Sequence, residues 1–294
     1  MMRTVRSFLI ATGFSLIAAT ALAEQAPYPK DEAALDQEYD ALQWQDTVQD
    51  YPLPASHGRI HLPQGFSVLL GADAERLVFL NNGIEFPGTE AVLYDESTKA
   101  LIDFTYLEEG YVKDDDWYDV DPEDFLAQMK EGQHASNAER VANGQDAFEV
   151  IGWIEEPIYN PKTHIAHYVV EMGNEQSHWV NAVAVKLGRA GHHEVTWVGG
   201  LDTFKASGPR TLDLALTSHD YDEGHRYADF KEGDNVAAYG LAGLVAAVAG
   251  VKLSKGLLAA AIGFLVLAGK KLFILVVPAF FGIRAAIKRF FRRS

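Results

Sequence analysis

Trp179-Val-Asn-Ala-Val-Ala-Val-Lys-Leu187 and Glu194-Val-Thr-Trp-Val-Gly199, joined through Gly188-Arg-Ala-Gly191, form the stretch of this chain that decides the fold. Both flanking runs are rich in Val, Trp and Thr, as β-strands are. The short connection carries Gly at each end, which is typical of a tight turn between antiparallel strands. This stretch therefore predicts two neighbouring antiparallel strands.

The strand pattern recurs on the N-terminal side of this hairpin. We predict strands at 147–154 and 164–172, a second hairpin of 90–95 with 100–107, and strand-like chain at 59–70 around a turn at 63–65. Residues 51–54 read as an extended connector. Helices are expected at 31–45, 73–80 (with Asp73 as N-cap), 122–131, 137–143 and 210–218. Strands in tandem, with helices grouped between them, predict an α+β fold around an antiparallel sheet, followed by a C-terminal membrane segment.

The N-terminus carries an export signal. Arg3 and Arg6 precede an apolar run that ends in Ala21-Leu-Ala23, the pattern of a secretory signal peptide cleaved after residue 23. The run is shorter than the roughly 20 residues that a transmembrane helix needs, which favours cleavage over an uncleaved anchor. The chain has no Cys, which excludes disulfides, thiolate metal sites and a lipid-modified N-terminal Cys. We expect export to a bacterial periplasm.

The C-terminal region is apolar and basic. Residues 236–269 hold apolar runs interrupted by Lys252 and Lys255, and predict a transmembrane region. Residues 270–294 mix Phe with Lys and Arg, which is typical of a segment bound to anionic lipid head groups. The positive charge places this end in the cytoplasm after a single crossing. Two membrane crossings as a hairpin also fit the length of this region, and would leave Arg292 and Arg293 on the outer side of the membrane.

Charge separates the two ends from the body. All 41 acidic residues lie between residues 24 and 235, whereas residues 236–294 hold nine Lys and Arg. A body this acidic repels phosphate, which argues against nucleic-acid binding. We divide the chain into a signal peptide (1–23), a helical and extended lead-in (24–56), an exported α+β domain (57–235), a transmembrane region (236–269) and a basic, aromatic tail (270–294). The domain is expected to face the periplasm from the inner membrane.

The densest group of acids is a candidate cation site. Seven carboxylates lie within residues 114–124. Hard cations such as Ca²⁺ are held by carboxylates brought together on one loop, so Asp114, Asp116 and Asp119 are the candidate metal ligands. The spacing departs from an EF-hand, because an aromatic residue occupies the third ligand position. Part of the group also has a structural explanation, since Asp121 is placed to cap a helix whose first turn carries acids.

The histidines and hydroxyl residues predict no catalytic site. On a strand, residues i and i+3, or i and i+1, point to opposite faces, so neither His164 with His167 nor His192 with His193 can share a metal ion. The hairpin register places His193 opposite Lys186, with no second His near it from this hairpin. The chain contains no nucleophile elbow, P-loop, zincin or dinucleotide motif. We therefore name no catalytic or cofactor-binding residue and favour a non-enzyme.

Four segments, which we call the signature segments, carry a resemblance to a known family. They are Glu109-Gly-Tyr-Val-Lys-Asp-Asp-Asp116, Gly152-Trp-Ile-Glu-Glu-Pro-Ile-Tyr159 with Thr163-His164, Leu187-Gly-Arg-Ala-Gly191, and Gly224-His-Arg-Tyr-Ala-Asp-Phe230. With them, over roughly residues 55–290, the chain resembles a family of uncharacterised membrane-anchored bacterial proteins that share one domain of unknown function. The resemblance implies a periplasmic α+β domain with a C-terminal anchor, and implies no activity. The chain departs from the family pattern at His167-Tyr168, where a Trp is expected, and at Trp117.

Binding is the function that we expect. The acidic domain, tethered to the inner membrane and to anionic lipids by its C-terminal region, would bind or organise a protein partner in the cell envelope. The alternative is a metal-dependent module, for Ca²⁺ or a similar ion, or a hydrolase, that uses the acids at 114–124. Arg226 and Asp229, three residues apart, are expected to pair and to orient the domain on its anchor.

Overall fold

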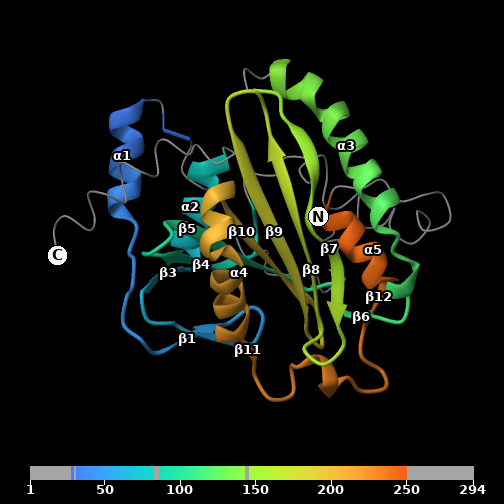
Figure 1. The fold of residues 1–294 in the computed structure, drawn as a ribbon. Helices are drawn as coiled ribbons and strands as arrows, with labels where there is room; N and C mark the ends of the chain where they lie inside the picture. The colour runs from blue at the N-terminus through green and yellow to red at the C-terminus, as the bar shows by residue number, and fades with distance from the viewer. Residues whose placement is uncertain (1–27, 30, 83–85, 143–145, 250–294) are drawn as a thin grey trace, which may run out of the picture.

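The computed structural model describes residues 28–29, 31–82, 86–142 and 146–249 of this chain. The predicted signal peptide, the basic tail and residues 250–269 lie outside the described residues, so the predictions made for them stay predictions. The described part is α+β, with antiparallel sheets flanked by helices, as the sequence pattern predicts (Figure 1).

A seven-stranded antiparallel sheet forms the centre of the molecule, in the order β3-β4-β5-β10-β9-β8-β7. The predicted central hairpin is confirmed, because β9 and β10 are neighbours and His193 lies opposite Lys186. The strands are β3 (Phe66–Leu70), β4 (Thr89–Asp95), β5 (Ala100–Leu107), β7 (Glu149–Asn160), β8 (Ile165–Gly173), β9 (His178–Leu187) and β10 (His192–Gly200).

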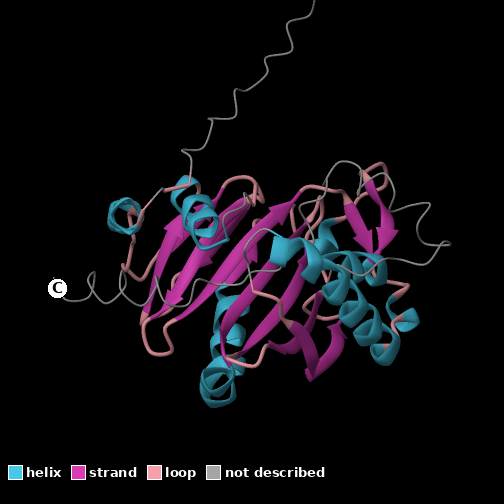
Figure 2. Cartoon of the chain, turned by 90° about the horizontal axis from the view of Figure 1, so that it is seen from above, coloured by secondary structure: helices cyan, strands magenta, loops and turns pink. Residues whose placement is uncertain are grey.

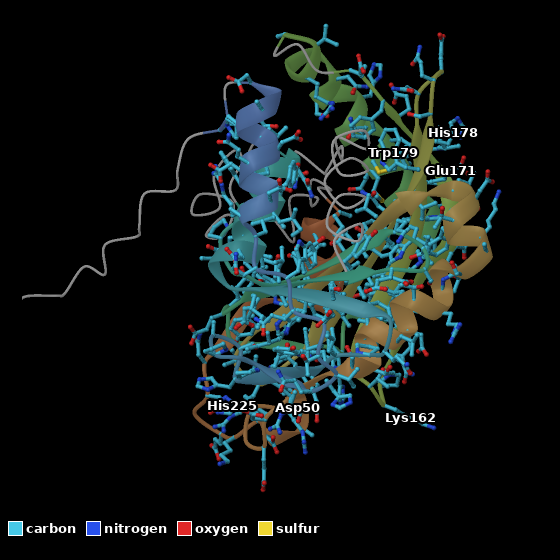
Figure 3. The ribbon with its side chains drawn as sticks, turned by 90° about the vertical axis from the view of Figure 1, so that its left-hand side faces the viewer. Asp50, Lys162, Glu171, His178, Trp179 and His225 are labelled. Atoms are coloured by element: carbon cyan, nitrogen blue, oxygen red, sulfur yellow. The ribbon has the colours of Figure 1, made fainter. Side chains whose placement is uncertain are left out.

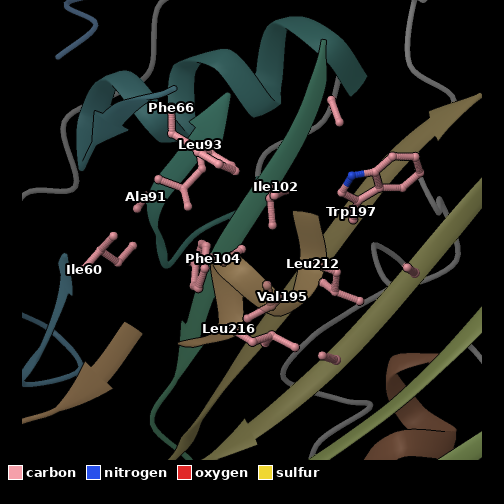
Figure 4. Close-up of a cluster of buried hydrophobic side chains, with 14 of the residues drawn as sticks. Ile60, Phe66, Ala91, Leu93, Ile102, Phe104, Val195, Trp197, Leu212 and Leu216 are labelled. Carbon is pink, nitrogen blue, oxygen red and sulfur yellow. The ribbon is translucent and has the colours of Figure 1, made fainter. Parts of the chain in front are cut away.

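One face of the sheet packs on α4 (Leu201–Ser218) and on a three-stranded sheet of β1 (Asp50–Leu53), β2 (Gly58–His61) and β11 (His219–Tyr221). Figure 4 shows the core between them, in which Phe104 and Trp197 of the sheet face Leu212 and Leu216 of α4. Alternation along each strand sends every second side chain into this core. Residues 51–53 of the predicted extended connector lie within β1, which is extended and paired.

The other face of the sheet carries two separate groups of helices, and Figure 2 shows helices on both sides of the sheet. Near β3 and β4 lie α1 (Glu32–Ala41) and α2 (Ala72–Asn82), which share a core with Leu69 and Val92. Over β7, β8 and β9 lie α3 (Pro122–Ala142) and α5 (Leu241–Val248), which share a core with Tyr168 and Val183. The central strands β5 and β10 run between the two groups.

Three helix predictions need correction. A single helix, α3, replaces the two that we predicted at 122–131 and 137–143, because Gln133 and Asn137 are buried and hydrogen-bonded to each other at 3.0 Å. The helix predicted at 210–218 starts at Leu201, because Phe204 extends the buried face past Pro209. Asp73 lies in the first turn of α2 and is not its N-cap.

The chain after residue 235 returns to the domain. Residues 236–249, predicted as the start of the transmembrane region, form β12 (Val236–Gly240) and α5. β12 pairs in parallel with β6 (Tyr111–Lys113), and α5 buries Leu241, Leu244 and Val245 against the sheet. In the described residues no helix combines the length and the apolar character needed to cross a membrane.

Candidate functional site

The signature segments meet around the ring of Tyr227. Tyr227 lies in the short 3-10 helix η2 (Tyr227–Asp229), and its side chain is buried. Tyr111 of β6 stacks on it with ring centroids 4.4 Å apart, and the His164 ring approaches from the β7–β8 turn at 4.3 Å. Phe230 lies 4.2 Å from Tyr111. We call these rings, with Trp117 and Tyr159, the Tyr227 cluster.

The turn between β7 and β8 places His164. Its backbone adopts a φ of 55°, its N–H donates to the Asn160 carbonyl at 2.8 Å, and its own carbonyl accepts from Leu187 at 2.9 Å. Asn160 favours this turn because its side chain accepts from the backbone of Lys162 at 3.0 Å. Figure 3 shows Lys162 at the same end of the molecule as His225, which precedes η2. The contact between the His164 and Tyr227 rings joins these two segments, which are far apart in sequence.

Asp114 is joined to the Tyr227 cluster by Tyr159. The Tyr159 hydroxyl donates to Asp114 Oδ2 at 2.5 Å and lies 3.1 Å from His164 Nδ1. Because the hydroxyl has one proton, its oxygen accepts from the N–H of a neutral His164. Burial lowers the pKa of His164, and the Asp114 carboxylate opposes that shift only in part. Burial and Asp114 raise the pKa of Tyr159, so this phenol stays protonated and acts as a donor.

Asp116 has a different partner. Its Oδ1 accepts from the backbone N–H of Ala242 at 3.1 Å, in the first turn of α5. A carboxylate is favourable at this end of a helix. Burial raises the pKa of Asp116, while this hydrogen bond opposes the shift.

The three candidate metal ligands therefore do not converge. Asp114 binds Tyr159, Asp116 binds the start of α5, and Asp119 is exposed in the 3-10 helix η1 (Trp117–Asp119). In the described ranges no three residues of the types His, Asp or Glu are placed to hold a metal ion. The structural explanation of Asp121 is confirmed, because its Oδ1 accepts from the backbone N–H groups of Glu123 and Asp124 at 2.9 and 3.1 Å.

Arg189 fixes the third signature segment to the fourth. Its Nε and one terminal nitrogen donate to the two carboxylate oxygens of Asp234, each at 2.7 Å. Its other terminal nitrogen donates to the Gly224 carbonyl at 2.9 Å. This bidentate pair lowers the pKa of Asp234 to about 2. The segment that leads to β12 is thereby held against the central hairpin.

Arg226 and Asp229 pair through the backbone of Arg226 and not through its guanidinium. Asp229 Oδ2 accepts instead from the backbone N–H groups of Gly224 and Arg226, at 2.9 and 3.1 Å. The Arg226 guanidinium pairs with Asp220 at 3.0 Å. A carboxylate three residues into a short helical turn lies closer to the free N–H groups at its start than to a neighbouring side chain.

A second polar network was not predicted from the sequence. His193 Nε2 lies 3.1 Å from Glu90 Oε2, its Nδ1 lies 3.0 Å from the Tyr221 hydroxyl, and the His219 ring lies 4.3 Å away. The hairpin register excludes a second His from the hairpin, but His219 comes from β11. One sequence feature could have revealed part of this network: Glu90 is an acidic residue at a buried position of a predicted strand. All four side chains are buried, so the network ties β11 to the sheet.

The Tyr227 cluster has an exposed rim. Tyr118 is 93% exposed, Phe230 is 38% exposed and Val236 is 40% exposed. Asp115 and Asp119 are exposed in the loop that follows β6, which also carries Tyr118. We call these five residues the aromatic–acidic surface. Since the half-buried phenol of Tyr159 is a donor held by a carboxylate, the arrangement suits binding better than nucleophilic catalysis.

Comparison with known proteins gives one family and distant structural likenesses. A family model described as "Protein of unknown function (DUF2167)" matches residues 45–281. No curated protein is similar to this chain. The solution structure of cyanobacterial PsbP (CyanoP) from Synechocystis sp. PCC 6803 is 14% identical, covers 60% of this chain and 94% of its own, and has a TM-score of 0.36. The Ran-binding protein Mog1p of Saccharomyces cerevisiae is 11% identical, covers 61% of this chain and 96% of its own, and has a TM-score of 0.26.

Proposed function

The chain belongs to the DUF2167 family of proteins of unknown function, and from that premise we propose that it is an exported, membrane-anchored domain that binds a protein partner in the bacterial cell envelope. The domain contacts this partner through the aromatic–acidic surface. The partner presents a basic segment with an apolar or aromatic side chain.

The observation that carries this proposal is the exposure of Tyr118, Phe230 and Val236 on segments that adjoin the Tyr227 cluster. Interface cores are enriched in aromatic residues, and the few residues that dominate binding are often Tyr, Trp or Arg. The rings beneath the surface are stacked on one another, as Tyr111 is on Tyr227. A rigid base of this kind lowers the entropy cost of binding.

Charge supports a basic partner. The exposed Asp115 and Asp119 adjoin the aromatic side chains, and all 41 acidic residues of the chain lie between residues 24 and 235. Complementary charge steers association and selects among partners. A basic segment of an envelope protein would therefore be attracted to this surface before the apolar contacts form.

The position of the surface supports a partner close to the membrane. β12 and α5 lie beside β6 and β7 (Figure 1), and the described chain ends at residue 249, directly after α5. An anchor formed by residues 250–269 would then begin next to the aromatic–acidic surface. The surface would lie near the outer leaflet of the inner membrane, within reach of the periplasmic segment of a membrane protein.

The test is co-purification of the full-length protein in detergent. We expect the wild-type chain to recover a stoichiometric protein partner. Combined substitution of Tyr118→Ser, Asp115→Lys and Asp119→Lys should reduce the recovered partner at least about tenfold, as loss of a central interface residue does. The control carries Glu131→Lys and Asp213→Lys, two exposed acids on α3 and α4. Recovery of the protein alone, or equal recovery with both variants, would contradict the proposal.

A Ca²⁺-dependent module is the second candidate, and the density of carboxylates in residues 114–124 favours it. It requires the loop to rearrange, because Asp114 and Asp116 have other partners. Addition of Ca²⁺ would then raise the midpoint of thermal unfolding, and the combined Asp→Asn variant of Asp114, Asp116 and Asp119 would lose that rise. An unchanged midpoint in the wild-type protein would exclude this candidate.

A further inference from the structure

The middle of one sheet face is polar. β5 and β10 are adjacent, with Asp103 opposite Thr196, Thr105 opposite Glu194, and Leu107 opposite His192. Directly opposite residues point to the same face, so these side chains share the face that carries the two separate helix groups. The helices α2 and α3 pack on the outer strands β4 and β7, on either side of this polar strip. A sheet face enclosed by helices is ordinarily apolar.

Two side chains on this strip are buried and lack partners. His192 is 0% exposed, and neither of its ring nitrogens has a hydrogen-bond partner among the described residues. The two carboxylate oxygens of Glu109, just beyond the end of β5, are likewise buried without a partner there. The His192 Nε2 lies 3.7 Å from Glu194 Oε1, so the ring is directed toward the carboxylate of Glu194. Buried polar groups in native proteins are nearly always hydrogen-bonded, and exceptions call for an explanation.

The pKa values of two carboxyl groups on this strip also indicate that a positive charge is missing. Burial, together with Glu194, raises the pKa of Asp103 to about 7. Burial raises the pKa of Glu109 to about 7 as well, with Glu194 adding to the shift and His192 opposing it. Glu194 thus repels both Asp103 and Glu109 in this partly buried strip, and no Lys or Arg among the described residues offsets that repulsion at either carboxyl group. A bound cation would remove this repulsion and supply the missing donors.

We propose that Glu109 and Glu194 form a binding site for an organic cation, an ammonium or guanidinium group, with a ring nitrogen of His192 accepting a further hydrogen bond. A bare metal ion is a poorer fit, because no three of the described His, Asp and Glu residues are placed to hold one. Metal–oxygen bonds of about 2.0–2.6 Å need closely converging ligands. N–H donors reach acceptors at about 2.7–2.9 Å from several positions on one group, so they tolerate carboxylates set further apart. Glu194, which is 21% exposed, leaves the site open to an incoming group.

The cation can come from two sources. Residues 250–294 follow α5 directly, and they carry nine Lys and Arg without any acidic residue. A free amine of the periplasm offers the same chemistry. The site and its ligand class are the same in both cases, and the experiment separates them.

The experiment measures thermal unfolding of the full-length protein with and without spermidine, against NaCl of equal ionic strength. Four chains are compared. They are the wild type, the site variant Glu109→Gln with Glu194→Gln, a control with the exposed Glu131→Gln and Glu175→Gln, and a tail variant in which the nine Lys and Arg after residue 249 are Gln. The site variant is also made in the tail-variant chain. Glu109→Gln alone replaces the site variant if the latter does not fold.

A free amine as the natural ligand predicts that spermidine raises the unfolding midpoint of the wild type and the control by about 5 °C at saturation. The site variant should show no rise. A cation from the chain itself predicts no rise in the wild type, a rise in the tail variant, and loss of that rise when the site substitutions are added. The proposal is overturned by a rise that survives in the site variant, or by the absence of a rise in both the wild type and the tail variant.

Discussion

The carboxylate of Asp116 lies 3.1 Å from the backbone N–H of Ala242 and accepts its hydrogen bond, although 126 positions separate the two residues. This contact joins the acidic loop after β6 to the first turn of α5. It gives Asp116 the role of a capping side chain supplied from outside the helix. A residue that looks like a metal ligand in the sequence thus holds the last described helix on the domain.

We first predict that Asp116→Ala destabilises the protein by about 0.5–2 kcal/mol, the usual cost of losing a capping side chain. The matched control is Asp115→Ala, which removes an exposed neighbouring carboxylate and should change the free energy of unfolding by less than about 0.5 kcal/mol. Urea unfolding of the three proteins measures the difference. Equal effects of the two substitutions would show that the contact with Ala242 contributes nothing.

The second prediction concerns Gly240, the residue before α5. A Cβ atom at this position would lie 2.3 Å from Asp116 Oδ2, whereas one at Gly152 would meet nothing within 4 Å. Gly240→Ala should therefore cost about 1–3 kcal/mol, as overpacking does, and Gly152→Ala should cost less. Combining Gly240→Ala with Asp116→Ala removes the clashing atoms, so the two costs should be less than additive in a double-mutant cycle. If the two costs are additive, the destabilisation by Gly240→Ala does not come from a clash with the Asp116 carboxylate.

The strands were predictable because their signals are local. Val-rich and Trp-rich runs with Gly at the turn determine the β9–β10 hairpin, and the register of His193 opposite Lys186 follows from the turn alone. The continuity of α3 was not predictable in this way. It depends on Asn137, whose side chain donates to the Phe148 carbonyl at 2.9 Å, a contact that no helical periodicity reveals.

The candidate site was predictable as a set of segments, and its geometry was not. The signature segments do meet, at Tyr227. The spacing of Asp114 and Asp116 could not show that one binds Tyr159 and the other binds α5. Residues 236–249 were assigned to the membrane because apolar composition is the same in a bilayer and in a protein core. Only the packing of α5 on the sheet distinguishes the two.

The third prediction is a loss of stability in acid caused by His219. Its ring is buried without a hydrogen-bond partner in the described structure, and burial, with the nearby His193 and Lys186, holds its pKa well below the usual value. The native state therefore keeps this ring neutral while the unfolded chain takes up a proton below about pH 6.5, so stability falls as the pH falls. Each such proton contributes up to about 1.4 kcal/mol per pH unit.

His219→Phe should reduce the slope of unfolding free energy against pH between pH 6 and pH 4.5, since Phe keeps an aromatic ring and cannot be protonated. The control is His134→Phe, because His134 has an 82% exposed side chain on α3. It should leave the slope close to that of the wild type. A wild-type slope in the His219→Phe protein would mean that His219 is already protonated in the native state.

The final prediction uses the opposite sign at Glu109. Burial raises the pKa of this carboxyl to about 7, so in the absence of a cation the native state holds a proton that the unfolded chain has released above about pH 4.3. The stability that the Glu109 carboxyl group contributes is complete below about pH 4.3 and is lost as the pH rises through about 7. Glu109→Gln should therefore stabilise the protein at pH 8 and leave it unchanged at pH 4, as measured by urea unfolding at the two values. Glu131→Gln, at an exposed position, should show no such difference.

If a cation already occupies the strip, Glu109→Gln should destabilise the protein at pH 8, because the bound charge then loses its carboxylate. The direction of the change at pH 8 thus reports whether the site formed by Glu109 and Glu194 is filled.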